Sequence, residues 1–222
     1  MLHRRIDRMP AIRHDDFRAL WGGSACSSIS LWTLLLGNAW IVYKHSDSSF
    51  WVGVSTFASM SPYLVAPVGG MVADRFERRF LVRATRVATF GVTMVLFGLA
   101  FADVLEVWMV VAMAFAQGMV RAIEIPADQS LLANVVPPED LANAVALTSM
   151  SQQGSRAAGP LLAGPLLATV GVEGAYAVSA IFALLAFTSV RRVQTSSRGG
   201  IVSLGDVVEN LRDGVAYIRA TP

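Results

Sequence analysis

Three charged residues lie at helical spacing within an apolar stretch of this chain, where ionised side chains are costly. Arg121, Glu124 and Asp128 are separated by three and four positions, so a continuous helix would place them on one face. A charge at the centre of a bilayer costs at least ~2.5–3.5 kcal/mol on insertion scales, so such residues usually face a partner or a cavity. Burial favours the protonated form of a carboxyl group, whereas a neighbouring arginine favours the ionised form. Both effects are expected at Glu124, so substrate binding next to Arg121 or Arg156 could shift its protonation, and Glu124 is the best candidate for a proton-binding group.

Further polar residues are expected at the depth of this group. If the following apolar stretch folds back as an antiparallel hairpin, counting from the turn places Gln152 and Arg156 level with Glu124 and Arg121. These four residues are predicted to line a substrate or proton pathway whose surplus positive charge suits an anionic or catechol-bearing molecule. The alternative is a structural arginine–carboxylate pair that holds the two helices together.

The elements that must position these residues are apolar stretches long enough to cross a membrane. The chain has 222 residues, of which 54% are hydrophobic and 15% charged, whereas soluble domains contain about 25% charged residues. A bilayer core needs about 20 helical residues, and this predicts an all-α membrane protein with six transmembrane helices. Residues 1–16 would be a cytoplasmic N-terminus, 17–190 the bundle, and 191–222 a cytoplasmic linker with an amphipathic helix. The six stretches are residues 17–43, 51–72, 80–101, 104–136, 141–170 and 172–190.

Orientation follows from the basic residues. Apart from Arg121 and Arg156, fifteen of the 18 Lys and Arg fall on one side of the predicted spans, and Lys44 falls on the other. Because short cytoplasmic loops are enriched in Lys and Arg, both termini are predicted to be cytoplasmic in the cell inner (plasma) membrane. The fifteen are Arg4, Arg5, Arg8, Arg13, Arg18, Arg75, Arg78, Arg79, Arg83, Arg86, Arg191, Arg192, Arg198, Arg212 and Arg219.

Composition argues against several other functions. Cys26 is the one cysteine, and the three histidines lie outside the apolar stretches, so we expect no metal, no cofactor and no buried Ser–His catalytic pair. The basic clusters lie between apolar stretches, which indicates a lipid bilayer as partner and not nucleic acid. The serines of the first stretch, Ser24 and Ser27 among them, are expected to pack or to bond the backbone rather than to bind a ligand.

The turn after the second stretch carries the most specific motif. Its sequence Gly70-x-x-x-Asp74-Arg75-x-x-Arg78-Arg79 resembles the signature loop between helices 2 and 3 of the major facilitator superfamily. The resemblance implies a cytoplasmic gate formed by these residues, with Arg78 reaching Asp128 at the cytoplasmic end of the fourth helix.

Two weaker motifs lie in the expected stretches. Gly154, Gly159, Pro160 and Gly164 resemble the antiporter motif G-x-x-x-G-P-x-x-G-G of the fifth helix. Gln117-Gly118 resembles the end of the R-x-x-Q-G motif of the fourth. The pattern around residues 125–141 is most similar to bacterial drug and siderophore exporters, the group that includes the enterobactin exporter.

The resemblance implies the N-terminal six-helix half of a transporter, not an enzyme. We expect proton-coupled export of a small amphipathic molecule such as a drug or siderophore, with a second six-helix half or a homodimer mate as partner. The alternatives are a non-functional truncated transporter fragment, a six-helix membrane enzyme and a channel. An enzyme would need a nucleophile beside a buried base, and a channel would need a filter loop or a ring of like charges.

Overall fold

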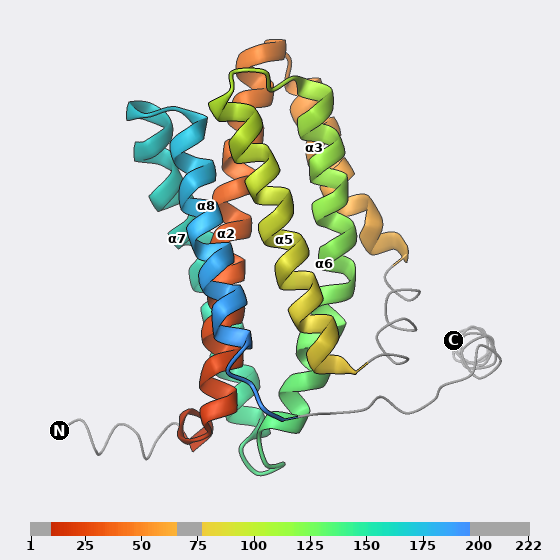
Figure 1. Cartoon of the computed structure of the whole chain (residues 1–222), viewed down its shortest axis with the longest axis vertical. Helices are drawn as coiled ribbons and strands as arrows, with labels where there is room; N and C mark the ends of the chain where they lie inside the picture. The colour runs from red at the N-terminus through yellow and green to blue at the C-terminus, as the bar shows by residue number, and fades with distance from the viewer. Residues whose placement is uncertain (1–9, 66–76, 196–222) are drawn as a thin grey trace, which may run out of the picture.

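The computed structural model describes residues 10–65 and 77–195, which form helices and connecting turns with no strand in these two ranges (Figure 1). The predicted all-α class is therefore confirmed for the described residues. The connections are short, and two of them contain an aspartate in the left-handed region, Asp47 and Asp103, a conformation that Asp tolerates better than most residues. The elements are η1 (Pro10–Arg13), α2 (Asp15–Ser46), α3 (Ser49–Met60), η2 (Ser61–Val65), α5 (Arg78–Phe101), α6 (Val107–Val135), α7 (Leu141–Thr169) and α8 (Val172–Val190).

Helix α2 is the central element of the bundle. It packs against α8 and α7 on one side and against α3 and α6 on the other, while α5 packs against α6 and α8 (Figure 1). Helices α6 and α7 make little direct contact with each other. The polar side chains of α6 and α7 must therefore meet across α2 or across open space, rather than in a closed two-helix interface.

Five of the six predicted stretches correspond to single α-helices, and the last has the bounds expected for it. The second does not: α3 ends at Met60 and continues as the 3-10 helix η2. Pro62 accounts for the break, because proline lacks the N–H that would continue the α-helical hydrogen-bond pattern, although Ser61 before it keeps the α conformation. Residues 66–72 of that stretch lie outside the described residues.

Four of the described helices, α2, α5, α6 and α8, are long and apolar enough to cross a membrane. Helix α7 has 29 residues, but Gln152, Gln153 and Arg156 interrupt its apolar character. Helix α3 has 12 residues, fewer than a span requires. Six transmembrane crossings therefore remain a prediction.

The buried core consists of two apolar clusters separated by a polar layer. One cluster contains Phe17, Leu81 and Leu131, and the other contains Leu34, Leu96 and Tyr176. Along α2, α5 and α6, the residues between the clusters include buried serines, threonines and charged groups. Because ionised groups in this layer are far from bulk water, each requires a partner within the bundle.

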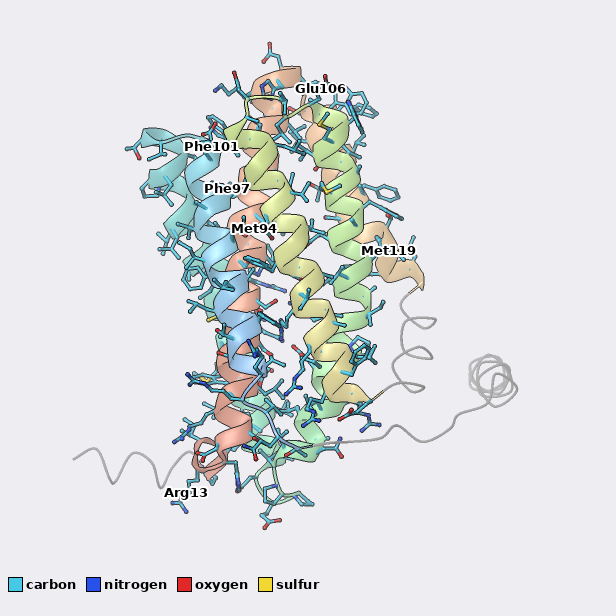
Figure 2. All side chains as sticks on the ribbon, in the orientation of Figure 1. Arg13, Met94, Phe97, Phe101, Glu106 and Met119 are labelled. Carbon is cyan, nitrogen blue, oxygen red and sulfur yellow. The ribbon has the colours of Figure 1, made fainter. Side chains whose placement is uncertain are left out.

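Large apolar side chains cover much of the outer surface. Met94 and Phe101 on α5 and Met119 on α6 are exposed by 40%, 77% and 42%, and Figure 2 shows them along the outside of the bundle. A contiguous apolar exterior of this kind suits hydrocarbon better than water. Arg13 and Glu106 lie at opposite ends of the bundle (Figure 2).

Two glycines permit the closest approaches between helices. A Cβ on Gly118 of α6 would collide with the carbonyl oxygen of Ser59 on α3, and a Cβ on Gly159 of α7 would lie 2.9 Å from the backbone nitrogen of Thr33 on α2. Close backbone packing through small residues is a main source of helix association in membranes. These two contacts fix α3 and α7 against the elements that carry the polar layer.

Candidate functional site

Arg86 lies at the centre of the polar layer. It projects from α5, its side chain is 0% exposed, and it donates hydrogen bonds to two carboxylates on α6. Its Nη1 donates to Glu124 Oε1, and its Nη2 donates to Asp128 Oδ2 at 2.7 Å. Ser24 of α2 also accepts from Nη2 at 3.0 Å. One guanidinium therefore joins α2, α5 and α6.

Glu124 is the most completely paired carboxylate of this layer. Besides Arg86, Glu124 Oε1 accepts hydrogen bonds from Arg121 Nη1 and from Ser27 Oγ, both at 2.9 Å. Its side chain is 1% exposed. Two guanidinium groups and a hydroxyl thus compensate for the removal of one carboxylate from water, which is the arrangement that a buried charge requires.

Asp128 is paired less completely. Its Oδ2 accepts from Arg86 and, at 2.9 Å, from Ser24 Oγ. Its Oδ1 is buried and has no hydrogen-bond partner among the described residues. The side chain is 20% exposed and lines a small cavity of about 40 Å³ together with Arg121 and Gln152.

The four charged side chains sum to zero. Arg86 and Arg121 carry two positive charges, and Glu124 and Asp128 carry two negative charges when both are ionised. We call this group the buried quartet. Because the charges balance within a few ångströms, the quartet can be enclosed in an apolar bundle at far lower cost than any one member could be.

An open cleft lies beside the quartet, between α2, α3–η2, α6 and α7. Two adjoining hollows of about 380 and 300 Å³ share five lining residues: Leu31, Trp32, Tyr63, Arg121 and Arg156. One hollow also contains Asn38 and Gln117, and the other Gln129 and Gln152. This combination of apolar walls and a few convergent polar groups is typical of small-molecule sites.

Arg156 gives the cleft its charge. Its guanidinium lies over the ring of Trp32, 5.4 Å from the ring centroid. Among the described residues, no carboxylate lies within ion-pair distance of Arg156 and none lines the two large hollows. Since the quartet is neutral, Arg156 leaves the cleft with a net positive charge.

A model of the family described as transmembrane secretion effectors, within the major facilitator superfamily, matches residues 8–222. The chain belongs to this family. The assignment confirms the superfamily resemblance inferred from the sequence motifs, and it favours a transporter over a membrane enzyme or a channel.

Three curated relatives illustrate what members of this superfamily do. The chain is 24% identical to macrolide efflux protein A of Streptococcus pyogenes over 91% of this chain and 51% of that protein. It is 26% identical to the staphyloferrin A transporter of Staphylococcus aureus over 68% of this chain and 38% of that protein. It is 27% identical to the enterobactin exporter EntS of Citrobacter koseri over 75% and 40%, respectively. The chain thus spans about half, or less, of the length of these relatives.

The structure divides the predicted polar patch of this family member into two parts. Arg121, Gln152 and Arg156 line the cleft. Glu124 instead points into the bundle toward α2 and α5 and is not among the cleft-lining residues. Arg121 connects the two parts, because it pairs with Glu124 and also lines the cleft.

The predicted contact between Arg78 and Asp128 is replaced by another. Among the described residues, the guanidinium that pairs with Asp128 is that of Arg86, two turns deeper along α5. Arg78 donates to the carbonyl oxygen of Ser130 at 3.5 Å. The assignment of Asp128 to a gate near the surface is therefore corrected, since Asp128 belongs to the buried quartet.

The rest of the predicted gate motif is only partly described. Gly70, Asp74 and Arg75 lie outside the described residues, as does the predicted amphipathic helix near the C-terminus. Arg79 pairs with Glu77 at 3.3 Å and donates to the carbonyl oxygen of Gln194 at 2.9 Å. The start of α5 is thereby tied to the segment that follows α8.

The glycines of the antiporter-like motif have different surroundings on α7. Gly159 packs closely on α2, whereas a Cβ on Gly154 or Gly164 would meet nothing within 4 Å. Pro160 lies inside the helix, which continues through it. The motif therefore contributes one tight contact between α7 and α2, and its other two glycines leave open space beside the helix.

Sequence reasoning missed three members of the polar layer. Arg86 was grouped with the basic residues of the second turn and the start of the third stretch, but it is fully buried. Ser24 and Ser27 were expected to pack or to bond the backbone, whereas their hydroxyls donate to carboxylates. The signal for Arg86 was its position within the predicted stretch of residues 80–101, where no further charged residue follows it until Asp103.

Proposed function

We propose that this chain forms part of an exporter that moves a small amphipathic anion across the cell membrane at the expense of the proton gradient. The cleft would hold the substrate, with its apolar part against Leu31 and Trp32 and its negative group near Arg156 and Arg121. The observation that carries the proposal is the position of Arg156, which lies over Trp32 in a cleft lined by no carboxylate among the described residues.

The charge of the cleft selects among the substrate types suggested by the relatives. Their names indicate efflux of a macrolide and transport or export of staphyloferrin A and enterobactin. A site with net positive charge favours an anionic or catechol-bearing molecule over a cation, because a cation would be repelled by Arg156 in a site that excludes much of the water.

The cleft is open on one face, and transport requires that it be closed alternately from each side. In secondary transporters this occurs when two helical bundles rock about a central site. We therefore propose that a second six-helix half, or a second copy of this chain, covers the open face in the working transporter, with both termini in the cytoplasm.

The proposal is tested by transport of an anionic and a cationic dye. Cells that lack other exporters would express the complete gene product, and efflux of carboxyfluorescein and of ethidium would be followed by fluorescence. Replacing Arg156 by Gln should reduce the affinity for the anion about 10- to 100-fold, because a lost charge-assisted contact costs about 1.5–3 kcal/mol. Ethidium efflux, where present, should not fall.

Arg191→Gln is the matched control. Arg191 lies at the end of α8, is exposed and contacts the ring of Phe187, so its loss should leave both dyes unaffected. The proposal is wrong if Arg156→Gln and Glu124→Gln both transport the anion as the parent protein does. In that case the polar residues only hold the bundle together.

A further inference from the structure

The two carboxylates of the buried quartet are not equivalent. Glu124 has two guanidinium partners and a hydroxyl, and its side chain is 1% exposed. Within residues 10–65 and 77–195, Asp128 shares a single guanidinium with Glu124, and its Oδ1 has no hydrogen-bond partner. An ionised carboxylate oxygen without a partner is expensive to bury, whereas a neutral carboxyl loses much less. Asp128 is therefore the member of the quartet that gains most from binding a proton.

Asp128 also has a route by which a proton could arrive. The cavity that it lines, at about 40 Å³, has room for a few water molecules. Polar side chains of α2, α6 and α7 surround this space, among them Ser28, Gln129 and Gln152. The same three residues also line the large cleft, so the small cavity adjoins the cleft. Glu124 lines neither space.

The charged surroundings of Asp128 are fully accounted for among the described residues. Arg86 faces it from α5, and Arg121 and Glu124 lie on its own helix. The groups that face it from α2 and α7 are neutral, namely Ser24, Ser28, Thr148 and Gln152. Glu124 offsets one of the two guanidinium groups, so one positive charge remains to hold Asp128 in its ionised form.

We propose that Asp128 is the carboxylate at which this transporter binds and releases its coupling proton, and that the proton passes between Asp128 and the cleft through the small water-sized cavity. The coupling of this proton to transport rests on the proposed function, whereas the protonation of Asp128 itself does not. A hydronium ion in the cavity gives its proton to a carboxylate oxygen of Asp128, so one O–H bond breaks, another forms, a water molecule remains, and the charge of the quartet rises from zero to +1. Arg86 keeps Glu124 as its partner throughout.

Carbodiimide labelling tests the proposal directly. Dicyclohexylcarbodiimide reacts with carboxyl groups that are neutral and in apolar surroundings. The complete gene product in membrane vesicles would be treated between about pH 5 and pH 9, and the adduct would be assigned to a residue by fragment mass spectrometry. We expect an adduct on Asp128 whose yield falls about tenfold for each pH unit above its midpoint, because the reactive form is the neutral one.

Two variants of similar size identify the residue. Asp128→Asn should abolish the adduct, and Glu124→Gln should retain it. An adduct on Glu124, an adduct that persists in Asp128→Asn, or no adduct on Asp128 at any pH of the parent protein would overturn the proposal. The last result comes from the unmodified protein and does not depend on the folding of a variant.

The labelling also separates this proposal from the proposed function. It uses no transport substrate, so an adduct on Asp128 without dye efflux would overturn only the assignment as an anion exporter. Dye efflux that depends on Arg156, without any adduct on Asp128, would overturn only the proton site.

Discussion

Replacement of Arg86 by methionine should destabilise the protein more than any other single neutralisation in α5. Methionine retains most of the apolar length of the side chain but removes the guanidinium that joins α5 to α2 and α6. Glu124 would keep Arg121 and Ser27 as partners. Asp128 would lose the one guanidinium partner that it has in the described part of the chain, and the quartet would carry one uncompensated negative charge.

The expected magnitude follows from burial. The side chains of Arg86 and Glu124 are 0% and 1% exposed, and breaking such a pair by removing one partner costs about 3–5 kcal/mol. Asp128 loses the same guanidinium, but its 20% exposure lets water offset part of that cost. For a domain of this size each kcal/mol lowers Tm by about 2–4 °C, so Arg86→Met should lower Tm by about 6–20 °C.

A thiol-reactive dye provides the assay. Cys26 is the one cysteine in the sequence and is partly exposed on α2 between Ser24 and Ser27, so an increase in the rate of its reaction on heating in detergent reports unfolding beside the quartet. Arg191→Met is the control, since an exposed substitution changes stability by about 0.5 kcal/mol or less. Adding Glu124→Gln to Arg86→Met restores charge balance and should recover at least half of the lost stability. If Arg86→Met unfolds at the temperature of the control, the quartet does not stabilise the fold and the reasoning fails.

Three further predictions concern topology, packing and pH. A membrane-impermeant thiol reagent outside intact cells should label Asp47→Cys but not Arg198→Cys in a cysteine-free background, because the distribution of basic residues predicts that both termini are cytoplasmic; labelling of Arg198→Cys contradicts this. Gly159→Ala should lower Tm by several degrees because its Cβ would lie 2.9 Å from a backbone nitrogen of α2, whereas Gly164→Ala on the same helix has open space and should be neutral; equal shifts would argue against the contact. The parent protein should bind an anionic dye more tightly as pH falls, since a proton on Asp128 adds positive charge beside the cleft, and Asp128→Asn should bind tightly at every pH; calorimetric titration measures both, and a pH-dependent Asp128→Asn is the opposing result. In this arrangement a bound proton strengthens the binding of the anion. Transport of the proton and the anion in opposite directions would therefore have to arise from the alternating exposure of the cleft to the two sides of the membrane.

Helix positions could be predicted from the sequence because apolar length and turn residues encode them locally. The last helix, Val172–Val190, was predicted with its observed bounds, and α6 was expected to place Arg121, Glu124 and Asp128 on one face. The break after Met60 was missed because the apolar run continues past Pro62. The length of that run was taken as evidence for one helix, and the helix-breaking effect of the proline was not used. Local patterns thus predicted where helices form better than where they end.

The partners of the charged residues could not be predicted in the same way. Arg121 and Glu124 are close in sequence, so their pairing follows from helical spacing. Arg86 is 38 residues from Glu124, and no local rule states which face of α5 meets α6. Hairpin counting predicts the depth of Arg156 and Gln152, but depth does not determine direction, and Glu124 points toward α5 and α2. The missing information was the order of helices around the bundle.

The neutrality of the quartet restricts how this protein can evolve. A single change that removes Arg86, Glu124 or Asp128 leaves an unmatched charge in the membrane layer, so most one-step paths pass through a poorly folded intermediate. Asp128 is the exception, because its loss has the same charge effect as a bound proton, a state that the bundle would already visit. Descendants that abandon proton coupling would therefore be expected to lose Asp128 first and to retain Arg86 with Glu124. The residue at position 128 would then indicate which relatives of this protein have kept proton coupling.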